Sequence, residues 1–411
     1  MKVRMYNVGF GDCFCLRDRK KSLLVDFGTN NSRIEGRPRR EIFDVIISDL
    51  STIKSKNLLL THFHMDHLSG LLYMMKKKDI SVDFGKIYLP DVFSKKEMSR
   101  TLVLLLLADL LKESGLPSRQ VSLFALVDAL LENKQNVELL SRGKLFENKY
   151  QALWPDTDVI RKETDEVYNR ICEDGKFKEV MDVLLEFAEK LRLIVWSMTA
   201  EGNKPAETVE KETDLTASEL TEQPEVRQKI IRAYVYEREF RRIKALPDFK
   251  KLLAWLNENQ INLRQFKHKI SIVFQNARDG ELNLLFTGDA QPEHLKMIAE
   301  NYDGKLPLYE HYWCIKVPHH GTQGHYFDFS QYEPENMLIS NGIHFANSKK
   351  ESKELRTSPL FVLLITRNVR YLFLIPDTHM YCSNCDCCDS YENGCSCKEA
   401  DVISPAYYKD I

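Results

Sequence analysis

Four residues that can bind a metal ion lie within six positions in the first part of the chain. They are His62, His64, Asp66 and His67, in the segment THFHMDHLSG that directly follows the apolar run NLLL. A divalent ion needs several neutral imidazoles or carboxylates that converge within about 2.0 to 2.2 Å, and a loop at a strand end can direct alternate side chains to one point. We expect His62 and His64 to serve one ion and Asp66 and His67 a second, so the spacing indicates a dinuclear site. A structural role for these side chains is the less favoured alternative.

The elements that position this loop can be predicted from the hydrophobic pattern. Short apolar runs broken by glycine-containing turns are typical of strands, and they occupy both ends of the chain. Two intervening segments have leucine-rich helical spacing instead. We therefore expect two halves of one sheet-containing fold (1–92 and 266–380), two helical insertions (93–143 and 156–265), a return strand of the core between them (144–155) and a C-terminal tail (381–411).

Several motifs resemble the metallo-β-lactamase superfamily, whose signature T/S-H-x-H-x-D-H is matched by residues 61–67. NVGFGDCFCL at 7–16 and LLVDFG at 23–28 resemble the paired N-terminal strands of the branch typified by the β-lactamase-like domain of the competence protein ComEC. LLFTGDA at 284–290 and KVPHHGT at 316–322 match later motifs of that branch in the same order. The resemblance implies an α/β fold, the four-layer αββα sandwich, here with two helical insertions and a Cys-rich tail.

The same resemblance implies a ligand set for two divalent ions, zinc or manganese. Asp289 would bridge the ions, and His319 or His320 would complete the second site. His268 is the only histidine between the first motif and Asp289, and it could be a metal ligand, a substrate contact or an exposed side chain. The later histidine-proline element of the branch is not evident, and the sequence offers His344 instead as a metal or substrate contact.

Other residues near these motifs are expected to support the site or to lie elsewhere. Asp12 and Asp26 lie at expected strand ends, near the segment 61–67, which is called the metal loop below. We expect Asp26 to hold the loop through hydrogen bonds, and we place neither aspartate among the ligands. Three further histidines, His294, His311 and His325, have no motif context and are expected to be structural.

The C-terminal tail contains a dense cysteine cluster with Cys-x2-Cys and Cys-x-Cys pairs. In a reducing compartment such clustering favours metal binding over disulfides, and four thiolates can form a closed tetrahedral zinc site. An additional structural zinc is therefore expected, with an unstructured tail as the alternative. The cysteines are Cys382, Cys385, Cys387, Cys388, Cys395 and Cys397.

Composition and charge limit the compartment and the partners of the protein. The chain has 411 residues, 43% of them apolar and 29% charged, with a formal charge of -2, so no global field attracts nucleic acid or anionic membrane. The start MKVRMYNVGF has no extended apolar stretch followed by a small-residue cleavage site, so we expect no secretory signal. The longest apolar run, 102–111, is too short to span a bilayer. We expect a cytoplasmic protein with no membrane partner.

One local segment could nevertheless bind a polyanion. Residues 227–251 hold nine Lys or Arg against three acids, interleaved with aromatic residues, and they follow an acidic stretch at 201–225 that we expect to be a loop or linker. The basic segment could lie along a phosphate backbone, or it could be a solvated helix face with its aromatic residues packed inside. The helical insertions could also dock a partner protein.

These patterns together favour a metal-dependent hydrolase in which Asp66 or Asp289 orients the attacking water. Resemblance to the ComEC branch favours a phosphodiesterase or nuclease that acts on nucleic acid or a nucleotide. One alternative is hydrolysis of a substrate that is not a phosphodiester. Another is an effector or interaction subunit whose activity depends on a partner protein, because the superfamily fold hosts many chemistries.

Overall fold

The computed structural model divides the chain into two compact units, which are described separately. Unit 1 consists of Met1–Pro90, Leu140–Asp156 and His268–Ile411, and unit 2 of Asp91–Leu139 and Thr157–Lys267. The structure describes residues 2–18, 21–34, 36–77, 83–112, 122–133, 135–202, 242–263, 265–340, 371–374 and 408–410.

The first sheet has seven strands in the order β16-β1-β2-β3-β6-β7-β8. Pairs β16/β1, β1/β2 and β2/β3 are antiparallel, whereas β3/β6 and β6/β7 are parallel. Strands β1 and β3 therefore run in the same direction as β6. The strands are β1 (Lys2–Tyr6), β2 (Phe14–Arg17), β3 (Ser22–Val25), β6 (Lys56–Leu59), β7 (Ile87–Pro90), β8 (Val137–Leu140) and β16 (Tyr408–Asp410).

The second sheet also has seven strands, in the order β15-β14-β13-β12-β11-β10-β9. Strands β12 to β15 are parallel, and the sheet continues with antiparallel β11, β10 and β9. Its strands are β9 (Leu145–Phe146), β10 (Tyr150–Trp154), β11 (Val273–Asn276), β12 (Leu284–Phe286), β13 (Cys314–Lys316), β14 (Asn336–Ile339) and β15 (Tyr371–Leu374). A separate pair, β4 (Arg33–Ile34) and β5 (Arg37–Pro38), is antiparallel.

The two sheets share one hydrophobic core in unit 1. Inward-facing side chains from both sheets form a single buried cluster, in which Phe14 of β2 meets Phe286 of β12 edge to face at 5.6 Å and Phe274 stacks on Phe286 at 5.2 Å. Each such aromatic side chain buries a large apolar area, so this cluster holds the sheets together face to face. Strand ends from both sheets are thereby brought to a common edge.

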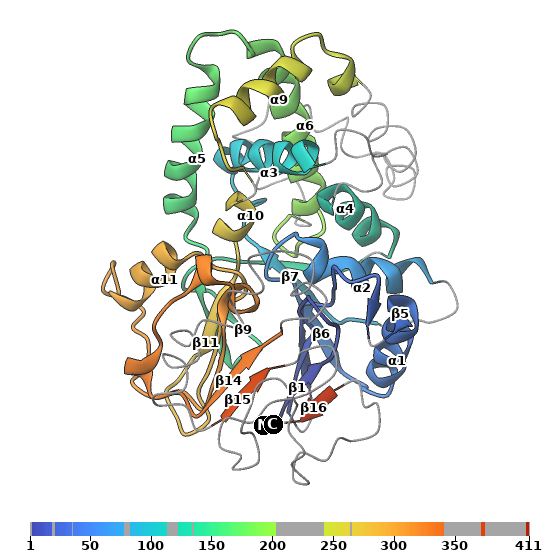
Figure 1. Ribbon diagram of the computed structural model, residues 1–411, viewed down its shortest axis with the longest axis vertical. Helices are drawn as coiled ribbons and strands as arrows, with labels where there is room; N and C mark the ends of the chain where they lie inside the picture. The colour runs from blue at the N-terminus through green and yellow to red at the C-terminus, as the bar shows by residue number, and fades with distance from the viewer. Residues whose placement is uncertain are drawn as a thin grey trace. The chain divides into compact units, whose positions relative to one another are not determined.

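Two helices pack near the first sheet and position the metal loop (Figure 1). Helix α1 (Arg39–Ser51) buries one apolar stripe, which includes Phe43, Ile46 and Leu50 at helical spacing. Helix α2 (Met65–Lys76) begins directly after His64, so Asp66 and His67 lie in its first turn. In the second half of unit 1, α11 (Pro292–Ala299) follows β12, and the short helix α10 (Gln265–Lys269) precedes β11.

Unit 2 is mainly helical and packs around its own apolar residues. Helix α3 packs against α5 and α6, and its residues Leu102 to Leu107 are almost fully buried. A buried ion pair between Lys267 and Asp109, joined by Ser122, adds a polar cluster within this unit. Its helices are α3 (Ser99–Lys112), α4 (Ser122–Glu132), α5 (Thr157–Cys172), α6 (Lys178–Trp196) and α9 (Phe249–Glu258).

The fold confirms the expected mixture of helices and sheets and corrects several details. Helices α1 and α2 lie in a region from which only strands were expected. Strand β8 lies in a segment expected to be helical. Across the part of the chain that the structure describes, no helix is both long enough and apolar enough to cross a membrane.

Candidate metal centre

The candidate ligands lie at the carboxyl ends of parallel strands, where loops from both sheets meet. In the first sheet, β3 leads to Asp26 and β6 leads to the 61–67 loop. In the second sheet, β12 leads to Asp289 and β13 leads to His319 and His320. This edge is where α/β folds commonly place their ligand sites, because the side chains of several loops converge there. The shared core therefore explains how residues more than 200 positions apart form one site.

One cluster combines the start of the metal loop with His268. His62 Nε2 lies 3.0 Å from His64 Nδ1, and His268 Nε2 lies 3.1 Å from the same Nδ1 atom. With Asp289, these residues form a group whose ligand atoms all lie within 4.8 Å of one another. His268 was left open between three roles by its sequence. The structure places it in the first cluster, where it is buried with an exposed fraction of 8%.

A second cluster combines the end of the metal loop with His320. Asp66, His67 and His320 are buried and also offer ligand atoms within 4.8 Å of one another. His320 Nε2 lies 3.5 Å from Asp66 Oδ2. Of the two adjacent histidines that the sequence could not separate, His320 is therefore the one in this cluster. His319 is half-buried and lies nearer to His268.

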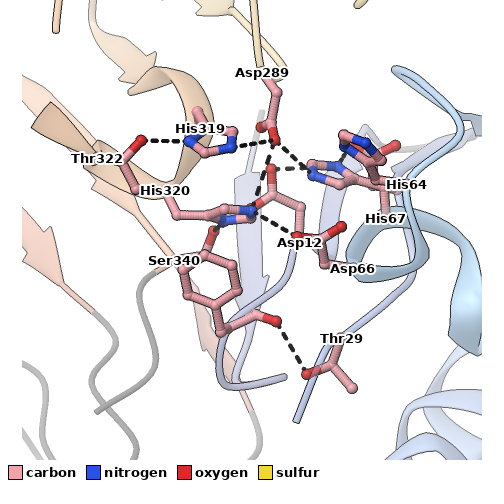
Figure 2. Close-up of polar contacts among 12 residues, drawn as sticks. Asp12, Thr29, His64, Asp66, His67, Asp289, His319, His320, Thr322 and Ser340 are labelled. Atoms are coloured by element: carbon pink, nitrogen blue, oxygen red, sulfur yellow. Dashed lines mark hydrogen bonds and ion pairs between the residues drawn. The ribbon is translucent and has the colours of Figure 1, made fainter. Parts of the chain in front are cut away.

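Asp289 lies between the two clusters. Its Oδ2 atom is 3.1 Å from His67 Nε2, 3.7 Å from His62 Nε2 and 3.8 Å from His320 Nε2. Figure 2 shows this carboxylate between His319 and His320 on one side and His67 on the other. The other oxygen, Oδ1, faces Lys316 Nζ at 3.4 Å. One carboxylate oxygen thus faces imidazoles of both clusters, so Asp289 would be able to contribute a ligand atom to either.

Asp26 holds the metal loop in place through hydrogen bonds. Its two oxygens accept hydrogen bonds from the Thr61 backbone N–H and hydroxyl, both at 2.7 Å, and from His67 Nδ1 at 2.8 Å. Burial raises the pKa of Asp26, and the interaction with His67 acts against this rise. Because the Thr61 hydroxyl donates its proton to Asp26, it accepts one from His62 Nδ1, 3.1 Å away. The Nδ1 atoms of His62 and His67 are therefore occupied, and their Nε2 atoms face the centre.

Asp12 supports His320 in the same way. It lies 3.2 Å from His320 Nδ1, it accepts a hydrogen bond from Ser340, and it forms a buried ion pair with Lys316. Lys316 also donates to the Gly288 carbonyl at 2.9 Å. In metal sites, a histidine that binds the ion with one ring nitrogen commonly donates the N–H of its other ring nitrogen to a carboxylate. Sequence reasoning placed Asp12 near the loop but missed Lys316, Ser340 and the contact to His320.

The backbone of this centre requires unusual conformations and close approaches. His319 and His320 both have left-handed backbone angles, with φ values of 45° and 55°, which non-glycine residues rarely adopt. A Cβ atom on Gly28 would lie 2.6 Å from the backbone of Asp66 and His67, so only glycine lets this loop approach α2. Strain of this kind persists where the surrounding structure enforces it, often at functional sites.

Buried carboxylates dominate the electrostatics of the second cluster. Burial lowers the pKa of His67, but the carboxylates of Asp289 and Asp26 outweigh it and hold this pKa well above its usual value. Burial likewise opposes protonation of His320, yet Asp12 and Asp289 raise its pKa to about 9. Imidazoles that gain protons despite complete burial indicate a strongly negative site. The centre therefore attracts cations.

The first cluster has a different electrostatic character. Burial holds the pKa of His62 well below its usual value, and the neighbouring His67 lowers it further. Burial also lowers the pKa of His268 to about 4. These rings are neutral at pH 7, which is the form that binds metals.

The donor set fits divalent metal ions, as the contacts of its own side chains show. His67 faces a carboxylate at each ring nitrogen, Asp26 at Nδ1 (2.8 Å) and Asp289 at Nε2 (3.1 Å). Positive charge is therefore needed at this position, as a proton on Nε2 or as a metal ion that takes the place of that proton. His320 Nε2 is buried and has no hydrogen-bond partner within the described parts of the chain. The charges agree with this, because the buried site holds four carboxylates (Asp12, Asp26, Asp66, Asp289) and, among the described residues, one ammonium, Lys316.

The comparison with protein families agrees with this geometry. Residues 6–91 match the metallo-beta-lactamase superfamily. The matched segment includes Asp12, Asp26 and the whole 62–67 motif, but it ends before His268, Asp289 and His320. A comparison with curated proteins gives no match for this chain. The superfamily match therefore covers the first half of the candidate centre, and the structure supplies the second half.

Some predicted residues fall outside the described structure, namely His344 and the six tail cysteines. The basic segment is described only from residue 242, where Phe249 is buried in unit 2. Away from the centre, His294 stacks on Trp154 at 4.4 Å and His311 lies 3.2 Å from Glu335. His325 was expected to be structural, but it stacks on His319 at 3.8 Å. No spacing in the sequence links His325 to the motifs.

Proposed function

We propose that this protein is a metal-dependent hydrolase with a dinuclear centre and that its substrate is a phosphodiester. One observation carries the proposal. Three imidazoles, those of His62, His67 and His320, present their Nε2 atoms within 3.1–3.8 Å of one carboxylate oxygen of Asp289. We assign His62, His64 and His268 to one ion, Asp66, His67 and His320 to the other, and Asp289 to both. Unit 1 is then the four-layer αββα sandwich of the superfamily, with unit 2 inserted into it.

The residues of the centre divide the work of hydrolysis between them. When bound, divalent ions supply Lewis acidity and make water nucleophilic near neutral pH. The carboxylates of Asp66 and Asp289 orient the attacking water as hydrogen-bond acceptors. Asp26 and Asp12 hold the rings of His67 and His320 in fixed orientations, so little reorganisation accompanies the reaction. The half-buried side chains of His64 and His319 mark the side from which substrate reaches the site.

The substrate class rests on the order of the sequence motifs and on the basic segment at 227–251. A phosphodiester has anionic oxygens that two cations can neutralise as charge develops. Nucleic acids and nucleotides both contain this bond, and the basic segment favours a long polyanion. We further propose that the protein is cytoplasmic and that the Cys-rich tail holds a structural zinc.

The test uses purified full-length protein loaded with Mn²⁺ or Zn²⁺ and a panel of bis-p-nitrophenyl phosphate, single- and double-stranded nucleic acids and cyclic nucleotides. We expect two ions per chain beyond those held by the tail, and hydrolysis of at least one phosphodiester. Asp66→Ala should abolish turnover while leaving the protein folded. If the metal-loaded protein hydrolyses no phosphodiester, the substrate assignment is wrong, and other substrates or a partner-dependent role replace it. If a metal-replete sample holds no ion at this centre, the hydrolase proposal is wrong.

A further inference from the structure

A third group of histidines lies beside the metal centre and contains no carboxylate. His268, His319 and His325 each offer one ring nitrogen within 4.8 Å of the others. The ring of His268 meets His319 at 4.6 Å and His325 at 5.0 Å, both edge to face. His319 and His325 are stacked with their centroids 3.8 Å apart. The metal centre as assigned uses His268 but leaves the other two rings without a function.

Thr322 fixes the orientation of the stacked pair. Its hydroxyl contacts Nδ1 of His319 and lies 3.3 Å from Nδ1 of His325, and Figure 2 shows the first of these contacts. A hydroxyl has one proton, so when it donates to one Nδ1 atom, the proton of that neutral ring is on Nε2. The Nδ1 atoms of both rings face the hydroxyl. Their Nε2 atoms are left for a ligand. When the hydroxyl donates to His325, His319 donates its Nδ1 proton to the hydroxyl, and His325 is the ring with an N–H donor at Nε2.

His268 provides a second donor. Its Nε2 atom belongs to the first metal cluster, 3.1 Å from His64 Nδ1. A neutral ring that uses Nε2 as a metal ligand carries its proton on Nδ1. This Nδ1 atom is buried and has no hydrogen-bond partner among the residues that the structure describes. A buried donor without an acceptor is destabilising, so an acceptor at this position would be stabilising.

The histidine group lies on the accessible side of the centre. The inner residues His62, His67 and His320 are fully buried, whereas His319 and His325 are half-buried. His319 Nε2 faces Asp289 Oδ2 at 3.9 Å, which is too long for a hydrogen bond. A ligand held by these rings would therefore lie next to the metal centre and remain within reach of solvent.

We propose that His268, His319 and His325 form a subsite for an oxyanion group of the substrate. The inference rests on the proposed function, because this oxyanion would be a phosphoryl oxygen of the phosphodiester cleaved at the metal centre. An anion suits the subsite better than a third metal ion. The group contains no carboxylate that could balance the charge of a third ion, and His268 Nε2 already lies in the first cluster. Imidazole N–H groups, in contrast, form strong charge-assisted hydrogen bonds to an anionic oxygen.

The experiment measures the affinity of inorganic phosphate for the metal-loaded full-length protein by calorimetry. His325→Ala should weaken phosphate binding by about 10-fold or more, because hydrogen bonds to charged groups contribute about 1.5–3 kcal/mol. His325→Gln retains an N–H donor and should recover part of that affinity. Thr322→Val should also weaken binding, because it frees both rings to rotate. The control is His311→Ala, whose ring is partly exposed and contacts Glu335 away from the site.

Metal content and thermal melting are measured for every variant. Phosphate affinity within twofold of wild type in both His325→Ala and Thr322→Val would overturn the subsite. Loss of an ion from folded His325→Ala would also overturn it and assign the ring to a metal site. Hydrolysis of bis-p-nitrophenyl phosphate is assayed separately. Phosphate binding that depends on His325 without any phosphodiester hydrolysis would reject the proposed function and retain an oxyanion site, whereas hydrolysis without that dependence would reject the subsite alone.

Discussion

His67 and Asp289 are 222 positions apart in the sequence, yet His67 Nε2 lies 3.1 Å from Asp289 Oδ2. His67 comes from the first sheet's loop and Asp289 from the second sheet's loop. Asp26 occupies the opposite nitrogen of the same imidazole at 2.8 Å. The histidine is therefore held between two carboxylates. Under the proposed assignment, Asp289 is the residue on which both ion sites depend.

We expect Asp289→Asn to lose metal and hydrolytic activity without unfolding. The amide has nearly the same volume but no negative charge, so it cannot balance two divalent ions. Substitution of residues that only hydrogen-bond to metal ligands reduces metal affinity by about 10–100-fold. Loss of a ligand shared by two ions should reduce the affinity further. Elemental analysis and Co²⁺ titration measure the effect. The matched control is Asp303→Asn, which removes a carboxylate paired with Arg142 away from the centre and should keep both ions. Normal metal content in Asp289→Asn would contradict the assignment.

Lys316 is expected to stabilise the centre through its buried ion pair with Asp12. Removing one partner of a buried pair leaves an uncompensated charge and costs about 3–5 kcal/mol. Lys316→Met should therefore lower the free energy of unfolding strongly when measured by denaturant titration in the presence of a chelator. Lys149→Met removes the same charge from a solvent-exposed pair with Asp18 and should cost less than about 1 kcal/mol. Equal effects of the two substitutions would show that the buried pair has no special role.

Gly28→Ala is expected to disturb the metal loop through packing alone. The added methyl group would lie 2.6 Å from backbone atoms of Asp66 and His67, and overpacking of this kind costs about 1–3 kcal/mol. We expect a lower melting temperature and weaker metal binding in the same variant. Gly280→Ala is the control, because nothing lies within 4 Å of its added Cβ atom. A Gly28→Ala protein that melts and binds metal as wild type does would refute this role for the glycine.

Local spacing was sufficient to predict the 62–67 loop, because all four side chains lie within six positions. Its supporting contact to Asp26 followed from the position of that aspartate at a strand end and is present in the structure. The choice between His319 and His320 could not be made from sequence. The orientation of the two side chains depends on two consecutive left-handed backbone conformations, which the sequence pattern does not predict. Lys316 was missed because nothing in the sequence around this lysine indicates that it pairs with Asp12 and Asp289 in the folded protein.

The fold shows the same division between local and long-range information. The strands with strong apolar runs between glycine-containing turns were predictable, whereas β8 (VELL) follows the leucine-rich helix α4 and has a similar composition. Helix α1 does carry a readable helical pattern in Ile42, Ile46 and Leu50, but it lies between glycine-broken strands. His325 has no motif spacing. Its place beside His319 depends on Thr322, so only the folded loop reveals it.

The Cys-rich tail lies outside the described residues, and its zinc site stays a prediction from sequence. Replacing Cys382 and Cys385 together by Ser should release one zinc ion and lower the melting temperature, because closed thiolate sites contribute folding energy. The two ions of the centre should remain, since their ligands are histidines and aspartates. Metal analysis before and after substitution measures both effects. Unchanged zinc content and melting would show that the tail does not bind the metal.

The basic segment provides the test of substrate length. Arg238 and Arg241 lie outside the described residues, and Arg242 lies at the point where the described chain resumes. If this segment guides a polyanionic strand to the centre, changing all three to Glu should weaken binding of long nucleic acid. Each lost phosphate contact should also reduce the slope of log affinity against log salt by about 0.7 to 0.9. Hydrolysis of bis-p-nitrophenyl phosphate should not change, because this small substrate needs only the metal centre. Loss on long substrates alone supports a nuclease with a basic guide, whereas no change on either substrate favours a small-molecule phosphodiesterase in which the segment is structural.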